Sequence, residues 1–333
     1  MRRRALIGVG AAASLAALYG FGMHLSAGGA AQPLKLRLAL PTVPHAGLLH
    51  LAAALGYFHD QGIDASLMRE IHGKAALAEL LQGRADLAVV ADVPVVIELL
   101  KGVPLNIVAS VANAPTELAV LGRTDRGIHG PRDLIGKRIG VSLGTSGEYF
   151  LWAFLVRNRM APDAPQFVDL PPAKLIGALR DGDVDAIAAW QPVRHQAELD
   201  FGNAIVSLPA PDAYAQRFVL VGRREYVQAH AQDLSRLIRA LLDAEVYVRA
   251  APARAKSMLA GLFKLNPEIL DPSWRDMTLE VEQQQAQLVT LEDVAAWAMA
   301  RGYAPRQPMP NFLSYLDLDP LLAVNPERVT VVR

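Results

Sequence analysis

Residues 179–192 read Leu-Arg-Asp-Gly-Asp-Val-Asp-Ala-Ile-Ala-Ala-Trp-Gln-Pro, which predicts a helix end, a glycine stop, a short apolar strand and then a loop. A similar pattern, Leu-Leu-Gln-Gly-Arg-Ala-Asp-Leu-Ala-Val-Val-Ala-Asp-Val, occupies residues 80–93. A leucine, a glycine and an aspartate recur at one common offset, as Leu80, Gly83 and Asp86 and again as Leu179, Gly182 and Asp185. Because two copies are too few for a repeat array, they indicate two similar α/β lobes. Open α/β sheets bind ligands at the carboxyl ends of their strands, so two such ends facing each other predict a cleft.

The composition supports two globular domains. The chain has 333 residues, of which 52% are hydrophobic and 20% are charged. Lys+Arg and Asp+Glu are equal at 33 each, and no basic run occurs after residue 4, so we expect no nucleic-acid partner. The chain has no cysteine, which excludes a thiol nucleophile, a Cys-bound zinc, a disulfide and a lipidated N-terminal Cys.

The N-terminus has the organisation of a secretory signal. Residues 2–4 are arginines, residues 5–23 are uncharged, and small residues occupy 27–31. The paired arginines resemble those of a twin-arginine signal. We therefore predict a signal peptide over residues 1–31 and a periplasmic protein. The alternative is an uncleaved anchor, because the uncharged stretch is long enough to span a bilayer.

Strands and helices alternate along most of the chain, which predicts an α/β fold with mainly parallel sheets. We expect residues 116–123 to form the strand that leaves the first lobe. A second series follows, and residues 217–221 form a strand that returns to the first lobe. The predicted lobes are therefore 34–123 with 215–333, and 124–214. Two crossing segments between the lobes predict a hinge that closes around a ligand.

Four segments together carry a family resemblance. Residues 56–64 (Gly-Tyr-Phe-His-Asp-Gln-Gly-Ile-Asp), 91–94, 133–141 and 182–192 resemble, in order, motifs of the extracytoplasmic solute-binding proteins that serve ABC importers for nitrate, sulfonates and taurine. The resemblance implies a two-lobed, type II periplasmic-binding-protein fold with the ligand between the lobes. It also implies a small-molecule solute and an ABC permease as partners.

Two positions depart from that family pattern. Residues 44–47 read Pro-His-Ala-Gly, where sulfonate-binding members usually have a small hydroxyl residue, and Ala91 replaces a glycine. The candidate ligands are therefore an organosulfonate, nitrate or another small anion, an aromatic acid, or a pyrimidine-like precursor.

Residues 142–147, Ser-Leu-Gly-Thr-Ser-Gly, lie between a predicted strand and a predicted helix. Such a turn directs free backbone N–H groups at an anion, so we predict that Gly144, Thr145 and Ser146 bind ligand. The alternative is an ordinary Ser or Thr helix cap.

Further candidates lie at other predicted strand ends. Thr42 and His45 follow the first strand, and Asp92 either pairs with a ligand ammonium or caps the next helix. Trp190 either closes over the ligand or packs between the lobes.

Two more candidates follow from the cleft geometry. Gln191 would orient the ligand by a hydrogen bond. The four predicted cleft loops contain no arginine, but Arg217, on the returning strand, could supply a cation to the cleft.

Neither a metal site nor a catalytic site is indicated. No His-x-x-x-His spacing occurs in the sequence, and Gly144-Thr145-Ser146-Gly147 misses the Gly-x-Ser-x-Gly spacing of a nucleophile elbow, with no acid–base pair evident around it. We expect a monomeric receptor with no cofactor, no metal and no enzymatic activity, which touches the membrane only through its N-terminus. The alternatives are a membrane-anchored sensing domain and a pyrimidine-precursor enzyme on the same fold. The enzyme alternative is weakened because the resemblance is to a Cys-containing protein and this chain has no Cys.

Overall fold

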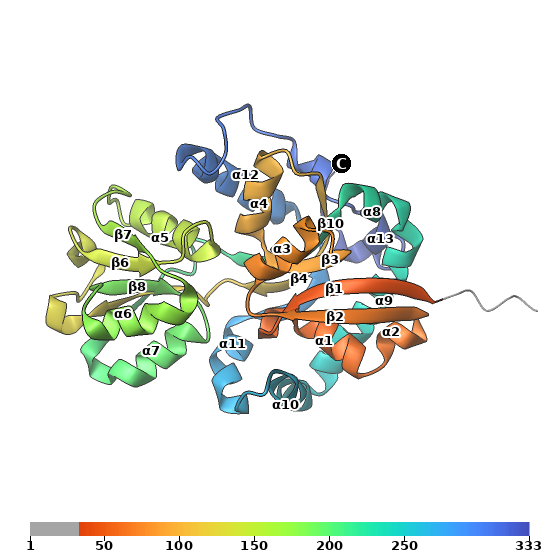
Figure 1. Cartoon of the computed structure of the whole chain (residues 1–333), viewed down its shortest axis with the longest axis horizontal. Helices are drawn as coiled ribbons and strands as arrows, with labels where there is room; N and C mark the ends of the chain where they lie inside the picture. The colour runs from red at the N-terminus through yellow and green to blue at the C-terminus, as the bar shows by residue number, and fades with distance from the viewer. Residues whose placement is uncertain (1–32, 333) are drawn as a thin grey trace, which may run out of the picture. The chain divides into compact units, whose positions relative to one another are not determined.

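The computed structural model describes residues 33–332, so the predicted signal segment 1–31 lies outside the described residues. The described chain forms two sheets with helices on both faces of each (Figure 1). The six-stranded sheet has the order β11-β4-β10-β3-β1-β2, and the five-stranded sheet has the order β7-β6-β8-β5-β9. The α/β class predicted from the alternation of elements is confirmed.

The six-stranded sheet is parallel at one end and antiparallel at the other. Strand β1 pairs parallel with β2 and β3, whereas β10 runs antiparallel between β3 and β4. Its strands are β1 (Leu34–Pro41), β2 (Ile63–Glu70), β3 (Leu87–Ala91), β4 (Leu105–Ala114), β10 (Gln216–Arg223) and β11 (Thr278–Glu282).

Both faces of this sheet are buried, because successive side chains of its strands enter two different hydrophobic clusters. In β3, Leu87 and Val89 belong to one cluster, and Ala88 and Val90 belong to the other. Figure 1 shows α3, α4 and α12 on one side and α1, α2 and α10 on the other. The helices of this part are α1 (Gly47–Ala54), α2 (Tyr57–Asp60), α3 (Gly73–Leu81), α4 (Asp92–Leu100), α8 (Arg224–Ala229), α9 (Ala231–Ala250), α10 (Pro252–Phe263), α11 (Asp271–Asp276), α12 (Gln285–Ala300) and α13 (Asp319–Leu322).

The five-stranded sheet is built on the same plan. Strand β6 pairs parallel with β7 and β8, as β1 does with β2 and β3. Its strands are β5 (Ala119–Arg123), β6 (Arg138–Val141), β7 (Gln166–Asp169), β8 (Ala186–Ala189) and β9 (Ile205–Pro209), and its helices are α5 (Ser146–Arg157), α6 (Leu175–Asp181) and α7 (Val193–Phe201).

The sequence repeat has the same local structure in both sheets. Gly83 and Gly182 end α3 and α6 with φ of 74° and 80°, a conformation that favours glycine. Asp86 accepts the Arg37 backbone N–H at 2.8 Å and pairs with the Arg37 guanidinium at 2.6 Å. In the second copy, Asp185 makes the corresponding bonds to Arg138, at 2.9 Å each. Each aspartate therefore joins the strand that follows it to the first parallel strand of its own sheet.

Two segments differ from the sequence-based description. Strand β5 pairs antiparallel with β8 and β9, so the chain crosses to the five-stranded sheet before residue 119 rather than after 123. Residues 278–282, for which no strand was predicted, form edge strand β11 beside β4. We propose that the lobes are 33–115 with 215–333, and 118–210.

Within residues 33–332, no helix combines the length and the apolar character that crossing a bilayer requires.

Candidate functional site

A cavity of about 310 Å³ is lined by residues from both sheets. Nearly all of its lining follows the carboxyl ends of the parallel strands. At the ends of β1, β2 and β3 the lining residues are Val43, His45, His72, Gly73, Lys74, Ala91 and Pro94. At the ends of β6, β7 and β8 they are Ser142, Leu143, Thr145, Ser146, Asp169, Leu170, Pro171, Pro172 and Trp190. The start of β10 completes the wall with Gln216 and Phe218. The cavity therefore lies where two open α/β sheets present the ends of their strands to each other.

Four of the predicted site residues line this cavity: His45, Thr145, Ser146 and Trp190. The imidazole of His45 is buried and stacks on the Phe218 ring, with ring centroids 4.0 Å apart. Its Nε2 lies 2.7 Å from a carboxylate oxygen of the fully buried Glu117, without the alignment of a hydrogen bond. His45 thus forms part of the cavity wall, and the Glu117 carboxylate lies against its imidazole on the side away from the cavity.

Three other predicted residues lie behind the cavity wall. The Thr42 hydroxyl donates to the Glu70 carbonyl at 3.1 Å and so ties the end of β1 to the end of β2. The Gln191 side-chain oxygen (Oε1) accepts the His195 backbone N–H at 3.0 Å, near the start of α7. Arg217 is buried, and its guanidinium lies 3.5 Å from the Thr290 hydroxyl. These three side chains have partners within the protein and are absent from the cavity lining.

Asp92 is also buried and bonded within the protein. Its carboxylate accepts the Val93 backbone N–H at 2.8 Å and the Tyr214 hydroxyl. The Tyr214 oxygen also lies 3.2 Å from the Ser146 hydroxyl, so these three side chains form one buried chain from α4 to α5. Burial raises the pKa of Asp92 to about 6, against the opposing effect of the Tyr214 hydrogen bond. Burial and the adjacent Asp92 raise the pKa of Tyr214, which keeps the phenol protonated as the donor.

In loop 142–147, backbone N–H groups that were predicted to bind an anionic ligand donate to carboxylates of the protein itself. The Leu143 N–H donates to Asp169 at 3.1 Å, and the Gly144 N–H donates to Glu148 at 2.7 Å. Thr145 caps α5, because its hydroxyl accepts the Gly147 N–H at 3.2 Å. The structure thus shows the helix-cap alternative at Thr145, and it commits the Gly144 N–H to an internal partner.

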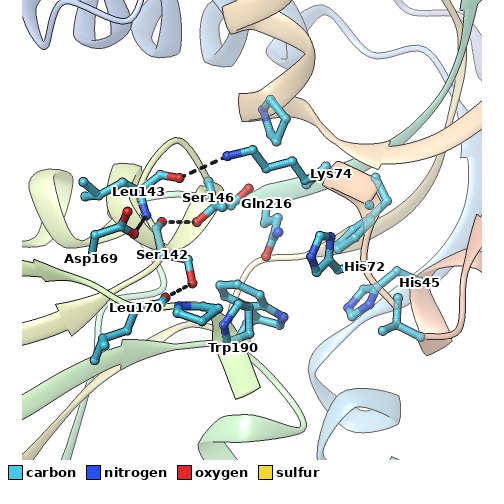
Figure 2. A pocket seen from close by; sticks show the side chains of 18 residues that line it. His45, His72, Lys74, Ser142, Leu143, Ser146, Asp169, Leu170, Trp190 and Gln216 are labelled. Carbon is cyan, nitrogen blue, oxygen red and sulfur yellow. Dashed lines mark hydrogen bonds between the residues drawn. The ribbon is translucent and has the colours of Figure 1, made fainter. Parts of the chain in front are cut away.

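Three ionisable cavity residues were not singled out from the sequence: His72, Lys74 and Asp169 (Figure 2). The Lys74 ammonium lies 3.4 Å from the Leu143 carbonyl oxygen, a contact that joins the two lobes at the cavity. The signal that could have found His72 and Lys74 is their place in the chain, between a strand end and a helix start. Loop 142–147 has the same place in the second lobe.

His72 presents a neutral ring to the cavity. Its Nδ1 accepts the Ala75 backbone N–H at 3.0 Å, so in the neutral ring the proton is on Nε2. Burial lowers the pKa of His72, which favours this neutral form.

Gln216 is a further cavity residue that the sequence did not indicate. The residue is 3% exposed, and its side-chain oxygen is buried without a hydrogen-bond partner in the described range. In the view of Figure 2 it lies between Ser146 and Trp190. A buried amide oxygen without a partner is costly, so this group is a strong candidate for a ligand contact.

Potential metal ligands are not grouped in the part of the chain that the structure covers. No cluster of three or more His, Asp or Glu side chains in residues 33–332 has the arrangement needed to hold a metal ion.

Comparison with known families gives a match over most of the region around the cavity. The family described as NMT1/THI5 like matches residues 43–255, which is more than half of the chain. The taurine-binding periplasmic protein of Escherichia coli K12 is 24% identical over 176 residues, which cover 52% of this chain and 54% of that protein. The chain spans about half the length of the curated relatives it matches first.

Solved structures share the fold over a greater length. The alkanesulfonate-binding protein from Xanthomonas axonopodis pv. citri, bound to MOPS, aligns with a TM-score of 0.75 at 20% identity, covering 86% of this chain and 99% of that chain. The periplasmic nitrate-binding protein of Synechocystis PCC 6803 aligns with a TM-score of 0.71 at 12% identity, covering 89% of each chain. These likenesses confirm the predicted two-lobed periplasmic-binding-protein fold.

Proposed function

This chain belongs to the NMT1/THI5-like family, and from that premise we propose that it is an exported receptor that captures a small solute and delivers it to the permease of an ABC importer. One observation carries the proposal: the cavity is lined by the strand ends of both sheets. A solute held there would touch both lobes at once and would favour the arrangement in which they are in contact. Relatives and structural neighbours are described as proteins that bind taurine, alkanesulfonates and nitrate, which supports a binding role over a catalytic one.

Two segments connecting the lobes support a hinge. Residues 115–118 and 210–215 lie between the sheets, and both approach the cavity: Glu117 contacts His45, and Tyr214 contacts Ser146. Direct contacts such as Lys74 to Leu143 would have to break for the lobes to separate. We propose that ligand entry and release involve opening about these two segments.

In this proposal, His45, Thr145, Ser146 and Trp190 contact the ligand. Thr42, Asp92, Gly144, Gln191 and Arg217 support the cavity wall from behind, because each is hydrogen-bonded within the protein. We also propose that the signal segment is cleaved, that the mature protein is a periplasmic monomer, and that it uses no cofactor.

The test is thermal unfolding of the purified protein against a panel of taurine, alkyl and aryl sulfonates, nitrate, aromatic carboxylates, carboxamides and pyrimidines. A ligand at 100 times its Kd adds about 2.7 kcal/mol to the free energy of unfolding, which is a clear rise in Tm. The shift should disappear in Trp190→Ala, which alters the cavity wall. It should remain in Trp274→Ala, whose ring packs against a different hydrophobic cluster. If no member of the panel raises Tm, the receptor proposal fails for these classes and the sensing-domain alternative gains weight.

A further inference from the structure

The cavity wall contains an amide side chain whose oxygen has no hydrogen-bond partner, and few positively charged side chains line the cavity. Gln216 is fixed by its backbone, which pairs with Ala114 in the β10–β4 ladder, while its side-chain oxygen is buried without a hydrogen-bond partner among residues 33–332. An amide offers both a donor and an acceptor at a fixed separation. A ligand group with the complementary acceptor and donor would satisfy both atoms.

The charges around the cavity do not favour a strong anion. Lys74 is the single Lys or Arg in the lining, and Asp169 lies in the opposite lobe. His72 is held neutral by its bond to Ala75 and by burial. The formal charge of Lys74 and Asp169 together is zero, so a sulfonate or nitrate entering the cavity would lose its hydration without a matching cation.

The backbone N–H groups that would stabilise an anion are partly consumed. Leu143 and Gly144 donate to the carboxylates of Asp169 and Glu148 at 3.1 and 2.7 Å. Glu148 is fully buried behind the loop, where its carboxylate occupies the positive end of the α5 dipole and is paired with Arg301 at 3.2 Å. The second lobe therefore presents hydroxyls and a neutral surface, with a carboxylate nearby.

Apolar and aromatic side chains form much of the remaining wall, including Trp190, Phe218, Val43 and Pro94. Flat ligands pack well against such surfaces. Resting on the receptor function proposed above, we infer that the cavity selects an uncharged planar solute whose polar group both donates and accepts hydrogen bonds, a carboxamide or a ring lactam, with Gln216 as the specificity-determining residue.

The experiment compares matched ligands by isothermal titration calorimetry. Benzamide is paired with benzoate and benzenesulfonate, nicotinamide is paired with nicotinate, and uracil represents a ring lactam. The inference predicts that at least one neutral compound binds, and that each neutral binder is at least 10-fold tighter than its anionic counterpart. Gln216→Leu should weaken that neutral compound at least 10-fold and reduce its advantage over the anion, because the ligand amide loses its partner.

Gln287→Leu is the matched control. Gln287 is also a buried glutamine whose amide has no partner in the described chain, but it does not line the cavity. Its replacement should leave binding unchanged, and the Tm of each variant without ligand reports whether the fold is intact.

The outcomes separate the two proposals. Binding of benzoate, benzenesulfonate or nicotinate without binding of any neutral compound would overturn this inference and leave the receptor function standing. Equal loss of affinity in Gln287→Leu and Gln216→Leu, or no loss in Gln216→Leu, would also overturn it. Absence of binding by every compound of both classes would overturn the inference together with the receptor function for these solutes.

Discussion

The Arg301 guanidinium lies 3.2 Å from the carboxylate of the buried Glu148, which joins the end of α12 in one lobe to the start of α5 in the other. Tyr303 donates its hydroxyl proton to the same carboxylate and accepts the Gly144 N–H at 3.1 Å. Arg301 also lies over the Phe167 ring, 5.4 Å from its centroid. We call Gly144, Glu148, Arg301 and Tyr303 the interlobe clasp. The clasp holds the lobes together beside the cavity. Its carboxylate, that of Glu148, accepts the Gly144 N–H in the loop that was predicted to bind an anion.

The first prediction concerns this clasp. Tyr303→Phe removes the hydroxyl that bonds Glu148 and Gly144, and it should lower the free energy of unfolding by about 1–2 kcal/mol. It should also favour separation of the lobes, seen as a larger radius of gyration in small-angle X-ray scattering without ligand. Tyr315→Phe is the control, because the Tyr315 ring packs on Phe312 and Arg224 and its hydroxyl makes no hydrogen bond within the described range. Equal scattering curves for all three proteins would contradict the role of the clasp.

The second prediction concerns His50, whose pKa burial lowers from its ordinary 6.5 to about 4. Between these values the unfolded chain binds a proton that the folded protein does not, so stability falls as pH falls. From pH 7 to pH 5 this group should cost about 2 kcal/mol, which His50→Gln should abolish. Urea unfolding at both pH values measures the difference. His59→Gln, at a side chain that is 94% exposed, should keep the wild-type pH dependence.

The third prediction concerns Asp92, whose effect on the pH dependence of stability is opposite to that of His50. Burial raises the pKa of Asp92 from 3.8 to about 6, so over that range the folded protein binds a proton that the unfolded chain does not. This contribution stabilises the protein at pH 5 and disappears as pH rises to 7, a loss of about 1 kcal/mol. Asp92→Asn keeps an oxygen that can accept from Tyr214 and Val93, and it should remove this pH dependence.

The measurement for Asp92 is the difference between variant and wild-type unfolding curves at the two pH values, because His50 acts in the opposite direction. Asp64→Asn, at an exposed strand position, should leave the difference at zero. A pH-independent difference for Asp92→Asn would show that this carboxyl titrates normally in the folded protein.

The fourth prediction tests whether the sequence repeat performs the same task twice. Asp86→Ala and Asp185→Ala each remove an acceptor that an arginine and a backbone N–H share, so each should lower the free energy of unfolding by about 1 kcal/mol. Asp183→Ala, at an exposed residue two positions before Asp185, should have little effect. Urea unfolding at pH 7 checks all three. Loss of stability in one copy alone would contradict the equivalence.

The fold could be inferred from local pattern in large part. The repeat at residues 80–93 and 179–192 identified two related lobes, and the glycine stops and following strands lie where the pattern placed them. The reason is that helix ends and buried strands depend on neighbouring residues: Gly83 and Gly182 adopt a positive φ, and the apolar runs after them bury both faces. The resemblance carried by residues 56–64, 91–94, 133–141 and 182–192 was confirmed by the family match.

The exact division of the lobes could not be inferred in the same way. Strand β5 has an apolar sequence that would suit either sheet, and its pairing with β8 and β9 places it in the second. Edge strand β11 exists because β4 offers it hydrogen bonds, although the surrounding sequence is mainly helical. Strand pairing joins residues far apart in the chain, which local periodicity does not report.

By itself, the sequence determined the two-lobed α/β plan, the strand ends that face the cavity and the presence there of His45, Thr145, Ser146 and Trp190. Only the tertiary structure decided how the polar groups pair. It placed Asp92 against Tyr214, paired the N–H groups of residues 143 and 144 with the carboxylates of Asp169 and Glu148, and left the Gln216 side-chain oxygen unpartnered at the cavity. The physical reason is that strand and helix formation follow from the properties of adjacent residues. Whether a buried polar group is free for a ligand depends on whether a side chain distant in the sequence forms a hydrogen bond with it.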